Sequence, residues 1–338
     1  MAHRAARLLL RGQVLAISVV LTAVVLGAWR AGVPAGERSG VNRLAPADAA
    51  KIDTLVRAKM PDCRFLNIGV VDNGKVVFTK AYGEGRLNGE YLYGSVSKPV
   101  TSTVIMQLRR EGLIRSLDDN VWAYLPRYSH SMPAAYAGAR LTLKHLLTHR
   151  SGIPHDEQPP FVDNRFNLQF EPGTRMLYST PGYGVLGQVI QAVTGSSYGD
   201  AVTKYVGDPV GASSFRADDN YMAPGALVHS TIEDMARFAI GIMNNRYMPA
   251  DVLYREVLRP ETGNYGYGWV VLNPDRDDVT ALHGGTNGLP RAYALIRPRQ
   301  KRAVVILAEA KTPGPVDLDA LSNDVLGVVA AAAGGGKR

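Results

Sequence analysis

The sequence predicts a mixed α/β fold: one antiparallel sheet built from both ends of the chain and flanked by helices, with a mainly α-helical domain inserted. Runs typical of strands occur at residues 65–71, 75–81, 266–272, 292–296 and 303–308. The segment between them, residues 116–261, mostly carries helical spacing interrupted by Gly and Pro loops. A length of 338 residues and a hydrophobic content of 46% allow a sizeable core.

The order of elements supports this prediction. A helix is expected at residues 47–59, because Pro46 is a residue type common at helix starts. Asp72, Asn73 and Gly74 separate the first two strands, and Asn and Gly tolerate the positive φ of a tight hairpin turn. Further helices are expected at residues 97–111, 143–148, 182–194, 231–244 and 316–332.

These elements suggest four segments. We expect a leader over residues 1–35, a linker over 36–45, one folded unit over 46–333 and a flexible tail over 334–338. Within the folded unit, residues 46–115 and 262–333 would form the α/β part, and residues 116–261 the mostly helical part.

The leader has the pattern of an export signal. Arg4, Arg7 and Arg11 precede an uncharged apolar run over residues 14–29, and the small residues around Ala35 could form a cleavage site. The run is shorter than the roughly 20 residues that span a bilayer comfortably. We expect export to the periplasm or the extracellular space, through a cleaved signal peptide or an uncleaved membrane anchor at residues 14–29. The alternative is a buried core helix.

The charge distribution excludes an obvious nucleic-acid partner. The formal net charge is +8, of which residues 1–43 contribute +5 and the last two residues +2, leaving +1 for the rest of the chain. A nearly neutral body has no basic footprint for nucleic acid. The single cysteine, Cys63, cannot form an intramolecular disulfide, and we expect a buried thiol.

Ser95 and Lys98 form the central chemical motif, S-x-x-K. A serine hydroxyl is a weak nucleophile and needs a base within hydrogen-bond reach. If a helix begins near Ser95, residues three apart share a face, and Lys98 lies beside the hydroxyl. The start of that helix would also offer free N–H groups to a developing negative charge. The alternative is a helix-capping serine with an exposed lysine.

Other motifs place this pair in a family context. The sequence resembles the superfamily of serine β-lactamases and penicillin-binding proteins, most closely its branch of class C β-lactamases, D-peptidases and related esterases. The resemblance covers residues 52–310 and rests on motifs in the family's order. These are Gly69-Val70-Val71, Tyr93 to Lys98, Leu117-Asp118-Asp119, Tyr124-Leu125-Pro126, His145 to Gly152, Pro172-Gly173-Thr174, Tyr178-Ser179, Gly182-Tyr183, Thr231 to Asp234, Tyr265 to Trp269 and His283-Gly284-Gly285.

The resemblance implies roles for individual residues. Ser95 would be acylated, Lys98 would share or relay its proton, and Tyr178 would act as partner base and then protonate the leaving group. His283 and Gly285 match the family's K-T-G strand in its histidine form, in which the histidine replaces part of the lysine's charge and hydrogen bonding. The backbone N–H groups of Ser95 and Thr286 would form the oxyanion hole.

Two departures argue against an efficient β-lactamase. Thr180 stands where the family's Y-x-N element has asparagine, and its single hydroxyl cannot contact both the substrate amide and the lysine. His283 in place of lysine weakens the binding of a penicillin carboxylate. Attack on an ester or a D-peptide remains possible.

Histidines also raise the question of a metal site. His145 and His149 are four residues apart, and His155 could be a third ligand, but Leu146 stands where the metalloprotease pattern has glutamate. A structural role at a helix end is the preferred interpretation.

We therefore predict a serine hydrolase acting on D-amino-acid peptides, including cell-wall peptides, or on small carboxylic esters, without a metal or organic cofactor. The alternatives are a true class C-like β-lactamase and, from another functional class, a non-catalytic cell-wall-binding or regulatory protein with this fold.

Overall fold

The structure is a computed structural model that describes residues 37–155, 161–162 and 165–335. The predicted leader, residues 1–35, lies outside the described residues. Within the described part of the chain, none of the helices combines the length and the apolar character needed to span a bilayer.

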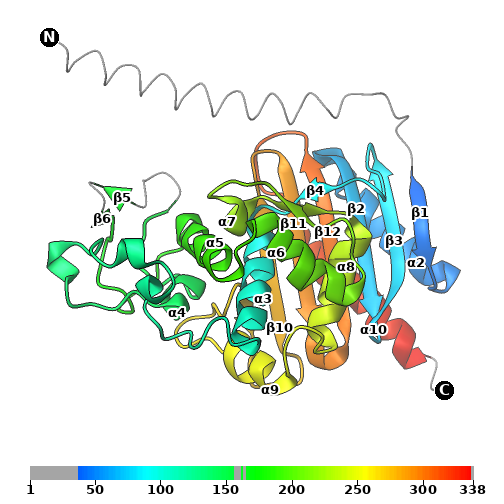
Figure 1. The fold of residues 1–338 in the computed structure, drawn as a ribbon. Coiled ribbons are helices and arrows are strands. Elements are labelled where there is room, and N and C mark those ends of the chain that lie inside the picture. Colours follow the sequence, from blue (N-terminus) through cyan, green and yellow to red (C-terminus); the bar gives the residue numbers. More distant parts are fainter. Residues whose placement is uncertain (1–36, 156–160, 163–164, 336–338) are drawn as a thin grey trace, which may run out of the picture. The chain divides into compact units, whose positions relative to one another are not determined.

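A seven-stranded antiparallel sheet forms the centre of the fold (Figure 1), in the order β1-β3-β2-β12-β11-β10-β9. Its strands are β1 (Arg38–Asn42), β2 (Cys63–Asp72), β3 (Lys75–Gly83), β9 (Val270–Leu272), β10 (Thr280–Thr286), β11 (Pro290–Arg297) and β12 (Arg302–Ala310). The pairing of β2 with β12 joins the N-terminal hairpin to the C-terminal three strands. The predicted sheet, built from both ends of the chain, is confirmed.

The β2–β3 hairpin turn has the predicted conformation. Asn73 and Gly74 have φ values of 50° and 69°, the two consecutive positive values that a tight hairpin requires. Cys63, at the start of β2, is buried, as expected of its thiol.

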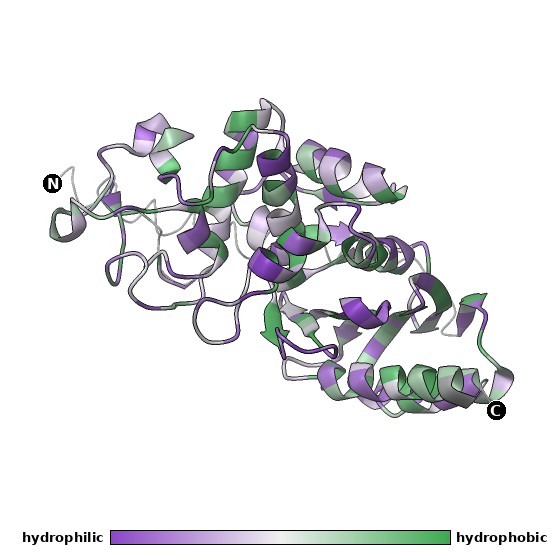
Figure 2. Cartoon of the chain, turned by 90° about the horizontal axis from the view of Figure 1, so that it is seen from below, coloured by the Kyte–Doolittle hydropathy of each residue, from purple (hydrophilic) through white to green (hydrophobic). Residues whose placement is uncertain are grey.

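Helices cover both faces of the sheet. On one face lie α2 (Pro46–Arg57) and α10 (Leu318–Gly335), and on the other lie α3 (Ser97–Arg110) and α8 (Ile232–Met243). Figure 2 shows hydrophobic and hydrophilic residues alternating along the helix that leads to the C terminus. These helices explain why β12 is apolar from Ala303 to Ala308, because a strand covered on both faces has no solvent-facing side there.

The side chains of β12 demonstrate this two-sided burial. Val304 and Ile306 pack in the core with α10, whereas Val305 and Leu307 pack in the core on the side of α3 and α8. Successive side chains of a strand point to opposite faces. Each such burial contributes about 1.5–3 kcal/mol to folding.

The region inserted between the two parts of the sheet is mainly helical, as predicted. Besides α3 and α8, its helices are α4 (Leu143–Leu147), α5 (Thr180–Thr194), α6 (Tyr198–Val202), α7 (Ala223–Ala226) and α9 (Ala250–Val252), and π-helical turns follow α6 and α9. Short strands complete it: β4 (Tyr91–Leu92), β8 (Val228–Ser230) and β7 (Arg216–Ala217) form one small sheet, and β5 (Phe161–Val162) pairs with β6 (Arg165–Phe166). In Figure 1, α4 and α5 lie beside the main sheet.

Three expectations differ from the structure. Residues 36–45, expected to be a linker, contain β1, an edge strand that pairs with β3 through its backbone and therefore needs no apolar pattern. Strand β9 is shorter than the predicted residues 266–272, because Gly268 has a φ of 80° that interrupts the extended backbone. Helix α10 continues to Gly335, past the predicted start of the flexible tail.

Candidate active site

Ser95 lies in a 3₁₀ turn, Gly94–Val96, that leads directly into α3. This turn packs against β10 so closely that glycine is required on both sides. A Cβ on Gly94 would lie 2.6 Å from the Thr286 nitrogen, and one on Gly285 would lie 1.9 Å from the Tyr93 carbonyl oxygen. Gly94 also has a positive φ of 52°. The position of Ser95 is therefore fixed by contact between backbones rather than by side-chain packing.

The same contact brings together the two predicted oxyanion donors. The Thr286 nitrogen lies at the junction between the Ser95 turn and β10, and a Cβ on Gly285 would be 3.0 Å from the Ser95 nitrogen. Thr286 and Gly285 both line the pocket that contains Ser95. Both backbone nitrogens thus lie where the Ser95 turn meets β10.

Lys98 lies in the first turn of α3 and is fully buried. Its ammonium donates to the Ser95 hydroxyl oxygen at 3.1 Å, to the Thr180 hydroxyl at 3.2 Å and to the Gly225 carbonyl at 2.8 Å. An ammonium group has three N–H donors, so one lysine can serve all three acceptors. The predicted adjacency of Ser95 and Lys98 is present, and the alternative of an exposed lysine is wrong.

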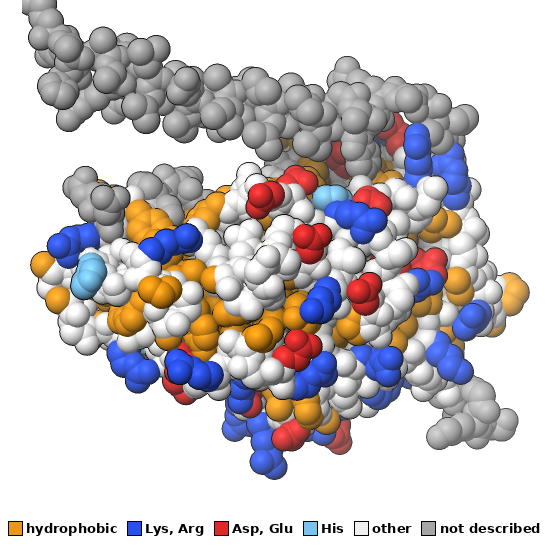
Figure 3. Space-filling model, viewed as in Figure 1, with side chains coloured by type: hydrophobic (Ala, Val, Ile, Leu, Met, Phe, Trp, Pro, Cys, Tyr) orange, Lys and Arg blue, Asp and Glu red, His pale blue; other side chains and the backbone are white. Residues whose placement is uncertain are grey.

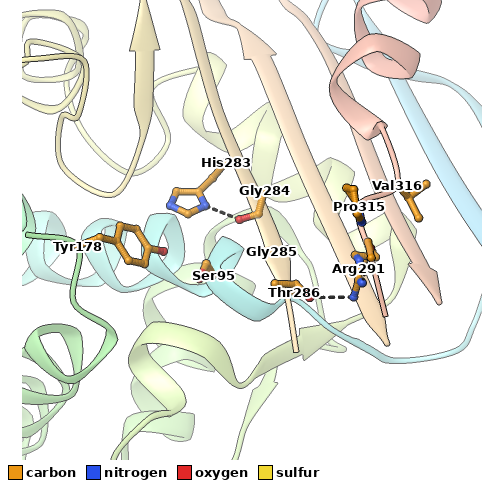
Figure 4. Close-up of a pocket in the computed structure, with 10 residues that line it drawn as sticks. Ser95, Tyr178, His283, Gly284, Gly285, Thr286, Arg291, Pro315 and Val316 are labelled. Atoms are coloured by element: carbon orange, nitrogen blue, oxygen red, sulfur yellow. Dashed lines mark hydrogen bonds between the residues drawn. The ribbon is translucent and has the colours of Figure 1, made fainter. Parts of the chain in front are cut away.

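Tyr178 precedes α5, and the Lys98 nitrogen lies over its ring. Its ring centroid is 4.6 Å from the Lys98 nitrogen, and the ring of Tyr183 is 5.6 Å from it, both within the range of cation–π attraction. Figure 4 shows Tyr178 with its hydroxyl end directed toward Ser95. The three residues predicted to carry the chemistry therefore converge from two segments that are distant in sequence.

Thr180 occupies a different place from the one expected of a substrate-binding residue. It is 2% exposed, accepts a hydrogen bond from Lys98 and is not among the residues that line the pocket. Its short side chain ends at the lysine and does not extend past it. Of the two contacts that the resemblance implies at this position, the structure shows the one to the lysine.

His283 lies on β10 with both ring nitrogens hydrogen-bonded. Nδ1 is 2.7 Å from the Gly284 carbonyl oxygen, and Nε2 is 3.0 Å from the Tyr265 hydroxyl. Because a carbonyl can only accept, Nδ1 carries the proton and Nε2 accepts from Tyr265. Burial lowers the pKa of His283 to about 3, and the charge of Lys98 acts in the same direction. His283 is therefore neutral at neutral pH, and the expectation that it replaces part of a lysine's charge is wrong.

The pocket in front of Ser95 has a volume of about 560 Å³. Its lining residues are Ser95, Tyr178, His283, Gly284, Gly285, Thr286, Arg291, Gly314, Pro315 and Val316 (Figure 4). With His283 neutral, Arg291 is the charged residue among them. Its guanidinium donates to the Thr286 hydroxyl at 2.8 Å and to the Gly314 carbonyl at 2.7 Å. Arg291 thus links β10 to the loop that precedes α10.

Figure 3 shows the charges on the face of the molecule seen in Figure 1. Lys and Arg side chains are interspersed with Asp and Glu side chains over this face. This face therefore presents no continuous basic surface of the kind that binds nucleic acid.

Sequence analysis did not assign three residues to the site. Gly225 supplies a carbonyl to Lys98 from α7, and a Cβ on it would lie 2.5 Å from the Thr180 methyl group. Tyr265 is buried and contacts His283, a position that the motif around it left undecided between cleft and core. His149 is buried beside Tyr178. No local pattern indicates Gly225, because its role depends on the approach of α7 to α5.

The histidines considered as metal ligands do not form a metal site. The His145 ring accepts from the backbone of Thr142 and completes the cap of α4, whereas His149 packs against Tyr178. Among the residues that the structure describes, no group of three or more His, Cys, Asp or Glu side chains could hold a metal ion.

Comparisons with known proteins agree with the fold. The chain is 25% identical over 329 residues to Protein flp of Staphylococcus aureus, covering 79% of this chain and 64% of that protein, so it spans less than two thirds of that relative's length. The solved structure of the octameric penicillin-binding protein homologue from Pyrococcus abyssi is similar, with a TM-score of 0.70 and 20% identity over 84% of this chain and 78% of that one. A D-stereospecific amidohydrolase from Streptomyces has a TM-score of 0.64 and 20% identity, covering 80% of this chain and 96% of that one.

The family comparison covers most of the chain. The family model described as Beta-lactamase matches residues 52–328, which include Ser95, Lys98, Tyr178 and the His283 strand. The chain therefore belongs to the beta-lactamase family.

Proposed function

We propose that this protein is a serine hydrolase that forms an acyl-enzyme on Ser95 and acts on D-amino-acid peptides or small carboxylic esters. The observation that carries the proposal is the fully buried Lys98, whose ammonium lies 3.1 Å from the Ser95 hydroxyl oxygen. A lysine held without solvent at a serine hydroxyl is the arrangement that proton transfer requires.

The reaction would proceed in two balanced steps. The Ser95 oxygen attacks the substrate carbonyl carbon while its proton passes to the Lys98–Tyr178 pair, in the reactive state in which Lys98 is a neutral amine or Tyr178 a phenolate, because an ammonium and a phenol together cannot accept another proton. The carbonyl oxygen takes the negative charge beside the Ser95 and Thr286 N–H groups. The bond to the leaving group then breaks, and the leaving alcohol or amine takes that proton. Water attacks the resulting Ser95 ester, which releases the acid and restores the hydroxyl.

Two features support a peptide or ester rather than a β-lactam substrate. The Thr180 hydroxyl accepts a hydrogen bond from Lys98, and Thr180 does not line the pocket. His283 is neutral, so it does not supply the positive charge that the resemblance assigns to binding of the penicillin carboxylate. Arg291, the charged lining residue, can bind a carboxylate, a group that both D-peptides and penicillins carry, so it does not separate these two substrates. The name of the similar D-stereospecific amidohydrolase is consistent with the peptide option.

We also propose that the protein is exported. The basic and apolar pattern of residues 1–35 supports this, and export would bring the Ser95 pocket to cell-wall peptides outside the cytoplasmic membrane. Fractionation of cells that produce the full chain tests it: we expect the protein in the periplasmic, extracellular or membrane fraction, and recovery in the cytosol alone would contradict export.

A substrate panel tests the proposed activity. The full chain is incubated with a peptide ending in two D-alanines, with p-nitrophenyl acetate and with a fluorescent penicillin, beside Ser95→Ala. Hydrolysis of either of the first two that is lost in Ser95→Ala supports the proposal. A long-lived penicillin adduct favours a peptidase, ester turnover without that adduct favours an esterase, and rapid penicillin turnover favours a true β-lactamase.

Ser102→Ala is a matched control for this panel. Ser102 is also on α3, is buried, and its hydroxyl has no hydrogen-bond partner among the described residues. If Ser95→Ala retains every activity and cellular function, the non-catalytic alternative replaces this proposal.

A further inference from the structure

We propose that His149 is the positioning residue of Tyr178, an inference that rests on the proposed function because it gives Tyr178 a catalytic task. His149 follows α4 and binds the chain on both sides of Tyr178. Its carbonyl oxygen accepts from the Leu177 nitrogen at 2.8 Å, and its Nδ1 accepts from the Ser179 nitrogen at 3.1 Å. The backbone before and after the tyrosine is thus held by one residue.

The His149 ring also contacts the tyrosine directly. The two ring centroids are 4.2 Å apart, and Tyr265 and Tyr183 lie 4.6 Å and 5.2 Å from the same imidazole. His149 is 1% exposed. The imidazole therefore packs beside the Tyr178 ring, whose centroid lies 4.6 Å from the Lys98 nitrogen.

The backbone of His149 has an unusual conformation. Its φ of 57° lies in the left-handed region, which is uncommon for residues other than glycine. Such conformations persist where the surroundings determine them, and they occur most often at functional sites. In this conformation the carbonyl and the imidazole both face residues 177–179.

The hydrogen bond to Ser179 requires a neutral imidazole. Nδ1 can accept only when the proton is on Nε2, because a protonated ring donates from both nitrogens. Burial lowers the pKa of His149 well below 6.5, and the charge of Lys98 acts in the same direction. The surroundings thus keep His149 neutral, so Nδ1 can accept the hydrogen bond from the Ser179 nitrogen. A neutral imidazole also adds no second positive charge beside the Tyr178 ring, which Lys98 contacts.

A core histidine that only stabilises the fold would make the same contacts, and a double-mutant cycle separates the two roles. The second-order rate of labelling of the full chain by a fluorophosphonate is measured for wild type, His149→Ala, Tyr178→Phe and the double variant. Steady-state kcat and KM for p-nitrophenyl acetate are measured in parallel. His149→Asn is the conservative control, because its Oδ1 can replace Nδ1 as acceptor and asparagine tolerates positive φ.

We expect His149→Ala to slow labelling by about 10- to 100-fold, the size of effect that a small misplacement of a reacting group produces. The loss should lie in kcat and leave KM unchanged, and His149→Asn should recover most of it. In the Tyr178→Phe background, His149→Ala should have no further effect, because its influence acts through the missing hydroxyl.

The opposite results overturn the inference. If His149→Ala labels as fast as wild type, or slows Tyr178→Phe by the same factor as wild type, His149 does not act through Tyr178. If His149→Ala does not fold, His149→Phe takes its place in the cycle, since it keeps the ring and removes the acceptor. If wild type itself does not react, the proposed function and this inference both fail. If wild type reacts and the variants do not behave as expected, this inference alone fails.

Discussion

The Lys98 ammonium nitrogen lies 3.1 Å from the Ser95 hydroxyl oxygen, and the lysine has no exposed surface. Ser95 lies in the 3₁₀ turn that leads into α3, and Lys98 lies three residues later in the first turn of α3, so helical geometry determines their relative position. The tertiary structure supplies the remaining acceptors of the lysine, from α5 and α7. The proton-transfer pair is therefore local in sequence, whereas its surroundings are not.

Replacement of the lysine should abolish most of the reactivity. We expect Lys98→Met to lower the rate of Ser95 labelling by about 10²–10⁴-fold, the usual contribution of a positioned proton-transfer group. The fluorophosphonate rate measures this, with Lys75→Met as control, because Lys75 is exposed at the hairpin turn of β2 and β3. A Lys98→Met protein that reacts as fast as the control would remove Lys98 from the mechanism.

The hydroxyl of Thr180 should matter to both stability and rate. Thr180→Val keeps the shape of the side chain and removes an acceptor of the buried Lys98 ammonium. Loss of a partner of a buried polar group costs about 1–3 kcal/mol of unfolding free energy. We expect a decrease of that size in denaturant unfolding and a slower labelling of Ser95. An unchanged free energy of unfolding would show that the Lys98–Thr180 contact contributes nothing.

Adjacent glycines on β10 should respond differently to alanine. The Cβ of Gly285→Ala would lie 1.9 Å from the Tyr93 carbonyl oxygen, whereas that of Gly284→Ala would make an ordinary contact of 3.6 Å with Tyr293. We expect Gly285→Ala to lose about 1–3 kcal/mol of stability, as overpacking does, together with its Ser95 reactivity. Gly284→Ala should retain both, as measured by thermal unfolding and labelling. Equal behaviour of the two variants would contradict the close contact between β10 and the Ser95 turn.

The free energy of unfolding should fall with acid because of His283. Its folded pKa of about 3 is below its ordinary value of 6.5, so the unfolded state binds a proton first as the pH falls. The contribution is complete above pH 6.5 and is lost between about pH 6.5 and 3, at about 1.4 kcal/mol per pH unit for one proton. Urea unfolding at pH 7, 5 and 4 measures the slope, which should be smaller in His283→Gln. An identical slope in the variant would mean that His283 is charged in the folded protein.

The parts of the site that the sequence could predict depend on contacts between near neighbours. The Asn73-Gly74 turn follows from backbone preferences, and the Ser95–Lys98 contact follows from helical spacing. Tyr178 and the His283 strand required the family resemblance, because no spacing rule connects residues so far apart in sequence.

The parts that could not be predicted depend on long-range packing. Strand β1 pairs through its backbone at a sheet edge and shows no apolar alternation, and Gly225 acts through a carbonyl that every residue type possesses. The sequence also could not predict that His283 is neutral, because burial and the charge of Lys98 lower its pKa.

The most direct test of the account is intact-mass spectrometry of the full chain after reaction with a fluorophosphonate, alongside Ser95→Ala and Ser102→Ala. We predict one adduct on wild type and on Ser102→Ala, and none on Ser95→Ala, because the Ser95 oxygen lies beside a buried lysine in an accessible pocket. No adduct on folded wild type, or an adduct that persists in Ser95→Ala, would contradict the assignment of Ser95 as the nucleophile.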